Sequence, residues 1–124
     1  MDVFLWIVAA LLAAVFLAAG TMKVIRTREQ LAASGLAWAT DFSAGAVRGI
    51  GALEILAAAG LILPPVVGIA EVLTPLAALG IVALMIGAAV THARRGERPL
   101  ILGNAVLLIL AALVAWGRFG PYSF

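Results

Sequence analysis

Four polar side chains stand in or beside long apolar stretches of this sequence and could move protons or hold a polar ligand: Lys23, Glu54, His92 and Asn104. Glu54 is the least expected of them, because every other residue of its segment, GALEILAAAG, is apolar or glycine. An ionisable side chain in such a segment is costly unless a partner neutralises it, and it is a candidate for function. We therefore expect Glu54 to be buried and partnered, either in an ion pair that locks the fold or in a ligand pocket.

The segments that carry these residues are apolar enough to cross a membrane. The 124-residue chain is 65% hydrophobic and 11% charged, whereas soluble domains have about 45–50% and about 25%. A spanning helix needs roughly 20 apolar residues, and the chain offers four such stretches. The sequence predicts an all-α membrane protein, a four-transmembrane-helix bundle that forms a single transmembrane domain over residues 1–124, with helices at about 3–25, 46–63, 66–93 and 98–118.

The connections between these helices carry different signals. The first connection contains TREQLAAS, which forms either a short interfacial helix ended by Gly35 or a plain polar loop. Pro64-Pro65 is expected to make a tight turn between the second and third helices, and Pro75 could kink the third. The first helix has no basic residue before it, so we expect it to remain in the protein as a membrane span rather than be cleaved as a signal peptide.

Lysine and arginine are distributed unevenly over these connections. Seven of the eight flank the first and third connections, and only Arg118 follows the fourth helix. The positive-inside rule then places both termini outside and connections 1 and 3 in the cytoplasm, as in a bacterial-type inner membrane. The same distribution argues against nucleic-acid binding, because the cations end apolar spans instead of forming a phosphate-tracking face.

With this topology, Lys23, His92 and Asn104 all lie near the inner ends of their helices, at a depth that Glu54 can reach. We expect these four to form a polar interior in the inner half of the bundle. Arg48 precedes Glu54 by six residues and lies about 120° around the helix from it, so it is expected to reach the lipid headgroups instead. At the outer side we expect a structural ion pair between Glu71 and Arg118.

Several kinds of chemistry are excluded by residue type. The chain has no cysteine, which excludes disulfides, thiolate metal sites and iron–sulfur clusters. It has a single histidine, so we expect no metal site within one chain. Small residues such as Gly45, Gly49, Gly80 and Gly87 recur on helix faces, which suits close helix packing and would also suit a homo-oligomer.

The order and spacing of four motifs are similar to those of the DoxX-like family of small four-helix membrane proteins. Gly20-Thr21-Met22-Lys23 closes the first helix, and Arg48, Gly51 and Glu54 form R-x-x-G-x-x-E in the second. LTPLAALGIVALMIGAAVTHARRGE ends the third helix in a Thr-His pair and a charged turn. NAVLLILAALVAWGRFG ends the fourth in Arg118.

The resemblance implies a function in a membrane redox system. The family takes its name from a subunit of a membrane thiosulfate:quinone oxidoreductase, and the wider group includes a chaperone for neurotransmitter-gated channels. The resemblance also implies that five residues form a common interior constellation: Lys23, Arg48, Glu54, His92 and Arg118. Members that work through cysteine chemistry are a poor guide, because this chain has none.

Two functional hypotheses follow. In the first, the chain is an accessory subunit of a membrane redox system, without autonomous catalytic activity, and holds a quinone- or lipid-like ligand near Glu54 and His92. Its partners would be the lipid bilayer and a membrane or peripheral redox protein. In the second, the chain is a non-enzymatic scaffold or chaperone that binds another membrane protein through its small-residue faces. A transporter is the weakest interpretation, since four short helices leave little room for a path.

Overall fold

Four long helices and a short helical segment between the first two of them make up the described residues. The computed structural model describes residues 2–124 and contains no strand among them. The long helices are α1 (Asp2–Ile25), α3 (Ala44–Val67), α4 (Leu73–Arg94) and α5 (Arg98–Phe119). All four are long and apolar enough to cross a membrane, which confirms the predicted membrane bundle.

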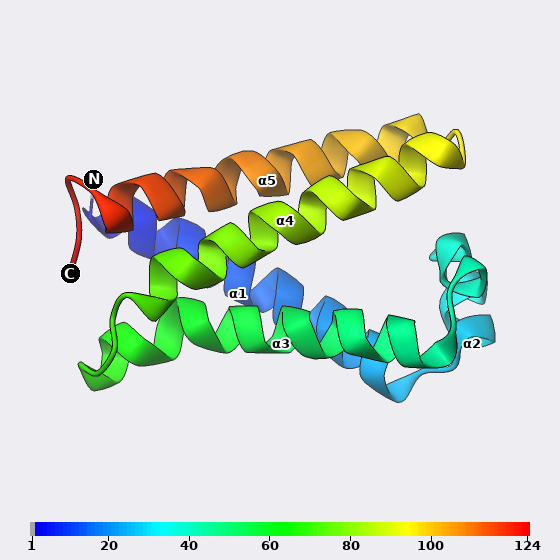
Figure 1. Ribbon diagram of the computed structural model, residues 1–124, viewed down its shortest axis with the longest axis horizontal. Helices are drawn as coiled ribbons and strands as arrows, with labels where there is room; N and C mark the ends of the chain where they lie inside the picture. Colours follow the sequence, from blue (N-terminus) through cyan, green and yellow to red (C-terminus); the bar gives the residue numbers. More distant parts are fainter. Residues whose placement is uncertain (1) are drawn as a thin grey trace.

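The helices associate as two pairs. α1 packs along α3, and α4 packs along α5, while α3 and α4 are in looser contact. Both termini and the α3–α4 connection lie at one end, which we call the terminal end, and Figure 1 shows α3 and α4 diverging from it. The opposite end carries α2, the following 3-10 helix and the α4–α5 connection, and we call it the basic end.

The segment between α1 and α3 is a short helix, one of the two alternatives that the sequence left open. α2 (Arg28–Ala33) begins at a capping box, in which Thr27 and Gln30 bond each other's backbone N–H groups. Gly35, at φ 106°, follows its end, and η1 (Ala37–Asp41) leads back toward α3. The buried side chain of Leu31 packs with Ala39 and Val47, which fixes this segment over the start of α3.

The turn between α3 and α4 lies later than the sequence suggested. Pro64 and Pro65 lie inside α3, which continues to Val67 and ends at Gly68 in a left-handed conformation, φ 73°. Pro75 is the third residue of α4, where its missing N–H costs no helical hydrogen bond.

A threonine from α4 explains how α3 tolerates two prolines. Pro64 and Pro65 cannot donate to the carbonyls of Gly60 and Leu61, four residues before them. The buried Thr74 hydroxyl lies 3.1 Å from the Gly60 carbonyl oxygen and 3.3 Å from that of Leu61, so it donates to the oxygens that the prolines leave free. A Cβ atom on Gly60 would come within 2.9 Å of the Ala77 side chain. The terminal ends of α3 and α4 are therefore held close together.

This contact gives the first prediction. Thr74→Val should lower the free energy of unfolding by about 1–3 kcal/mol, because two buried carbonyls lose their donor. Reversible unfolding in SDS measures it. Thr21→Val is the matched control, since the exposed Thr21 hydroxyl donates only to Leu17 within its own helix. Equal stability of Thr74→Val and Thr21→Val would contradict this explanation of the turn.

Candidate functional site

The buried carboxylate of α3 pairs with the lysine that ends α1. The distance from Lys23 Nζ to Glu54 Oε1 is 2.7 Å, and the side chains are only 9% and 4% exposed. The ammonium group also lies 5.7 Å from the ring centre of Trp38 in η1. The contact is an ion pair without a well-aligned hydrogen bond, because the buried Glu54 Oε1 has no hydrogen-bond partner among residues 2–124. Lys23 is therefore the partner that the position of Glu54 requires.

Two glycines allow this pair to form. Gly20 and Gly51 each lie three residues before a member of the pair, one turn along the same helix. A Cβ atom on Gly20 would lie 2.6 Å from the Gly51 carbonyl oxygen, and one on Gly51 would lie 2.7 Å from that of Gly20. Only glycine at both positions lets the two backbones cross so closely. The crossing brings Lys23 and Glu54 within ion-pair distance of each other.

The pair lines a large cavity between the two helix pairs. The cavity has a volume of about 940 Å³, near the upper end of the roughly 300–1,000 Å³ typical of ligand sites. Its walls are mostly apolar, with side chains from all four long helices and from the segment around η1. The side chains with polar atoms among its lining residues are those of Lys23, Trp38, Glu54, Thr91, His92 and Asn104.

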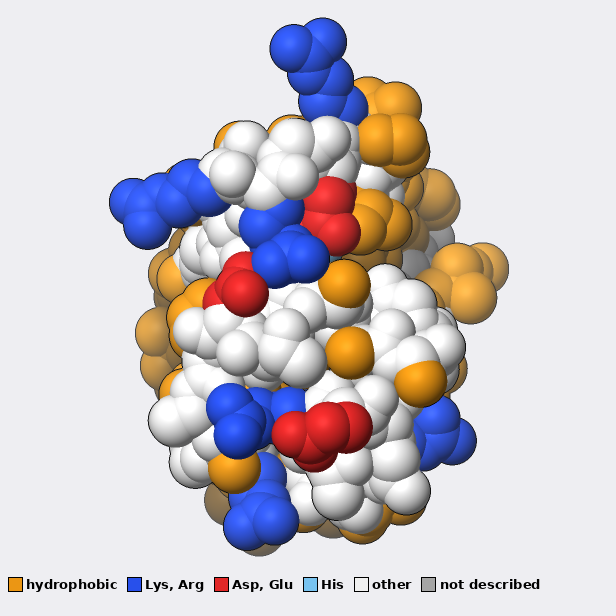
Figure 2. Space-filling model, turned by 90° about the vertical axis from the view of Figure 1, so that its right-hand side faces the viewer, with side chains coloured by type: hydrophobic (Ala, Val, Ile, Leu, Met, Phe, Trp, Pro, Cys, Tyr) orange, Lys and Arg blue, Asp and Glu red, His pale blue; other side chains and the backbone are white. Residues whose placement is uncertain are grey.

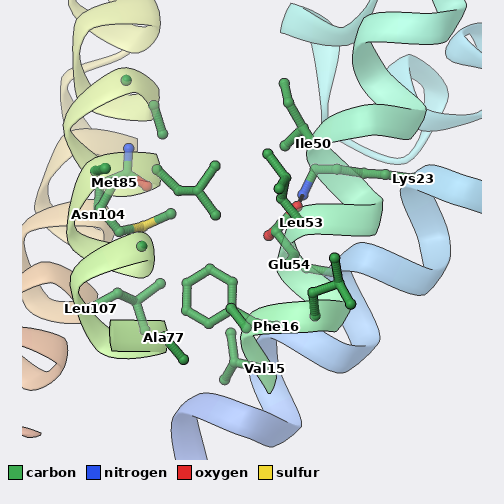
Figure 3. Close-up of a pocket in the computed structure, with 18 of the residues that line it drawn as sticks. Val15, Phe16, Lys23, Ile50, Leu53, Glu54, Ala77, Met85, Asn104 and Leu107 are labelled. Carbon is green, nitrogen blue, oxygen red and sulfur yellow. Dashed lines mark ion pairs between the residues drawn. The ribbon is translucent and has the colours of Figure 1, made fainter. Parts of the chain in front are cut away.

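Asn104 lies across the cavity from the ion pair. Figure 3 shows it on the opposite side from Lys23 and Glu54, near Met85. The Asn104 Nδ2 atom is buried and has no hydrogen-bond partner among residues 2–124. Buried amides usually find a partner, and an unsatisfied one calls for an explanation. The four residues expected to form a polar interior thus line one cavity, but only Lys23 and Glu54 are in contact.

His92 belongs to a charged cluster at the basic end. Its Nδ1 lies 3.0 Å from Glu97 Oε1, and because the carboxylate accepts, Nδ1 carries the proton. Arg95 donates to Glu97 from its Nε at 3.1 Å and also pairs with Asp41 of η1. This cluster connects the α4–α5 connection to the segment packed on α1 and α3. Figure 2 shows acidic side chains set among the lysines and arginines of this end.

Arg48 is exposed, and its contact with lipid headgroups stays a prediction. It borders a second, smaller hollow of about 180 Å³ together with Lys23, Arg26, Arg28 and Glu29. Arg48 makes no ion pair among residues 2–124, whereas Arg28 donates to the Phe42 carbonyl at 2.8 Å. Arg48 therefore stays outside the main cavity.

The outer ion pair differs from the expected one. Arg118 pairs with Asp2, not with Glu71. The reason is the contact between α1 and α5: Gly117 leaves room for Leu5, since a Cβ atom there would overlap the Leu5 side chain. This contact brings the start of α1 beside the end of α5, while Glu71 lies in the α3–α4 connection.

The C-terminal residues complete the environment of Arg118. Its side chain is 2% exposed and donates to the Tyr122 carbonyl at 2.8 Å. The Phe124 ring centre lies 4.0 Å from the guanidinium carbon, and that of Trp6 lies 5.8 Å from it. Arg118 is thus enclosed at the terminal end and lines neither cavity.

Some of the site was not found from the sequence. Asp41 and Arg95 are 54 residues apart, and no local pattern connects them. The position of Trp38 over Lys23 depends on the path of η1, which no local pattern predicts. The glycines did leave a signal, because Gly20-x-x-Lys23 and Gly51-x-x-Glu54 repeat one spacing on two helices.

The glycine crossing gives a second prediction. Gly51→Ala should destabilise the protein by about 1–3 kcal/mol, because the added methyl group overlaps the α1 backbone and the Lys23 side chain. Gly49→Ala, two residues away and with open space around it, should be neutral or stabilising by up to about 1 kcal/mol. SDS unfolding of both variants measures the difference. A Gly51→Ala protein as stable as Gly49→Ala would show that the crossing is not close.

The cluster at the basic end gives a pH prediction. The hydrogen bond from His92, aided by the charge of Arg95, holds the pKa of Glu97 below its usual 4.5, although desolvation opposes this. A lowered pKa means that the stabilisation is complete above the unfolded value and is lost as the pH falls through the folded one. The Tm difference between the wild type and Glu97→Gln should therefore be complete at about pH 6 and shrink as the pH falls below 4.5. A pH-independent difference would contradict the role assigned to the Glu97 carboxylate.

Comparison with known proteins identifies the family to which this chain belongs. A search of the curated proteins finds no match, and neither does a search of the solved structures. The model of the DoxX-like family matches residues 7–114, which include most of both helix pairs and all the polar residues of the main cavity. The resemblance noted in the sequence is thereby confirmed: the chain belongs to the DoxX-like family.

Proposed function

We propose that this membrane protein is a binding subunit that holds a quinone- or lipid-like ligand in the main cavity and serves a membrane redox system. The observation that carries the proposal is the cavity itself, about 940 Å³ of mostly apolar space with a few polar groups. Ligand sites commonly combine an apolar wall with a small number of polar groups that fix orientation. An unpartnered Asn104 amide and the Glu54 carboxylate supply such groups.

The shape of the cavity supports a long apolar ligand. Its α4 wall runs from Leu73 to His92, which at ~1.5 Å per residue is about 28 Å of helix. The protein's residues supply binding and orientation, while any electron transfer would come from the ligand.

The orientation in the membrane is part of the proposal. Seven of the eight lysines and arginines flank the connections of the basic end, and the positive-inside rule then assigns this end to the cytoplasm of a bacterial-type inner membrane. Both termini would lie outside. The wider end of the gap between α3 and α4 would face the cytoplasmic leaflet, near any peripheral redox partner on that side.

One observation favours the alternative, a scaffold or chaperone for another membrane protein. Gly45 and Gly49 lie on an exposed face of α3, with nothing within 4 Å of an added Cβ atom. Such a face suits close packing by a partner helix or by a second copy of the chain. In this alternative the ion pairs only fix the bundle, and the cavity binds no specific small molecule.

Mass spectrometry of an organic extract of the purified protein, preceded by an absorbance spectrum, separates the two functions. We expect one long-chain ligand in near-stoichiometric amount. Gly80→Leu, which places a side chain into the cavity, should remove it. Gly103→Leu is the matched control, because Gly103 also has open space around it but does not line the cavity.

A contrary outcome is equally clear. Bulk phospholipid alone in the extract, the same in both variants, would contradict the binding function and favour the scaffold. Glu54→Gln adds a second check, since it should also reduce ligand occupancy by about tenfold or more if the carboxylate contacts the ligand.

A further inference from the structure

The electrostatic balance of the main cavity restricts what it can hold. Lys23 and Glu54 neutralise each other at 2.7 Å, and the His92 Nδ1 is engaged by Glu97. No free lysine or arginine is among the described residues that line the cavity. An anionic head would therefore meet a carboxylate without a cation to spare, and burial of an unpaired charge is strongly unfavourable.

Two hydrogen-bonding groups are left over on facing walls of the cavity. Glu54, ion-paired as a carboxylate, offers only acceptors, and its single partner leaves lone pairs free. Asn104 Nδ2 offers a donor with no partner among residues 2–124. Thr91 is already engaged, because its hydroxyl donates to the Gly87 carbonyl at 3.0 Å. A free acceptor on one wall thus lies across from a free donor on the other (Figure 3).

The cavity also opens toward the surrounding lipid. Leu53, Leu56 and Leu76 line it and are 54%, 67% and 47% exposed, so the cavity is open on this side and not sealed within the bundle. They belong to α3 and α4, the helices that diverge from the terminal end in Figure 1. A ligand dissolved in the bilayer could therefore enter sideways between these helices without passing through water.

We propose that the cavity selects a neutral, long-chain amphiphile whose head carries a hydroxyl group, and that it takes this ligand directly from the bilayer. This inference rests on the binding function proposed above and names its ligand class. A hydroxyl both donates and accepts, so it donates to the Glu54 carboxylate and accepts from Asn104 Nδ2. An ether or a carbonyl of the same length only accepts, and it leaves Glu54 without a second partner. A hydroxyl on a plain alkyl chain and one on a hydroquinone ring are equivalent in this respect.

The test compares ligands that share a hexadecyl chain and differ only in the head group. Wild-type protein in nanodiscs is loaded with tritiated hexadecan-1-ol, which is then displaced by unlabelled hexadecan-1-ol, methyl hexadecyl ether or hexadecyl phosphate at matched mole fractions in the lipid. The alcohol should displace at least about tenfold more effectively than either competitor. A hydroquinone and its quinone with equal decyl chains form a second pair of competitors. The hydroquinone should displace the labelled alcohol more effectively than the quinone by a similar factor. Comparing this pair with the alcohol and ether shows whether the hydroxyl of an alkyl alcohol or that of a hydroquinone binds better.

A variant then assigns the donor. Asn104→Leu should weaken binding of the alcohol by about tenfold and reduce its advantage over the ether. Thr21→Val is the control that should change neither value, since the exposed Thr21 hydroxyl donates to Leu17 within its own helix and does not line the cavity. Equal displacement by ether and alcohol, or tighter binding of the phosphate, would overturn the hydroxyl inference while leaving a binding cavity in place. No saturable binding of any probe would overturn the binding function itself.

Discussion

The ion pair between Lys23 and Glu54 is the constraint on which the rest of the structure depends. A carboxylate in the middle of an apolar helix cannot face lipid, so α3 must turn Glu54 toward a cation. The Lys23 ammonium lies 2.7 Å from the Glu54 carboxylate because Gly20 and Gly51 let the backbones of the two helices approach closely. This close crossing makes α1 and α3 a fixed pair, and it sets the position of one wall of the cavity.

The helix pair α4 and α5 is attached to α1 and α3 in a different way at each end, and this difference creates the cavity. α4 meets α3 closely at the terminal end, where Thr74 satisfies the carbonyls freed by two prolines and Gly60 lies against Ala77. Toward the basic end the helices diverge, and a cluster of polar contacts connects them instead: Asp41, His92, Arg95 and Glu97. The structure is thus tightly packed at one end and connected by ion pairs and hydrogen bonds at the other, which is the end where a ligand pocket can open.

Much of this architecture could be predicted from composition and spacing, because four uncharged stretches of spanning length admit few folds. The burial of Glu54 and a partner at the depth of Lys23 also followed from the cost of a lone charge in lipid. What could not be predicted depends on contacts between distant residues. Arg118 pairs with Asp2 because Leu5 fits against Gly117, and Pro64-Pro65 lies within a helix because Thr74 lies beside it. The cavity is a gap between helices, and no residue pattern records its volume.

The most direct test of the central claim measures the stability of Lys23→Met, Glu54→Leu and the double variant by reversible unfolding in SDS. Each single change leaves one buried charge unpaired and should cost about 3–5 kcal/mol, whereas the double change removes both charges and should recover most of that loss. Additive losses in the double variant would mean that Lys23 and Glu54 do not depend on each other, and they would contradict the claim that this ion pair holds α1 and α3 together.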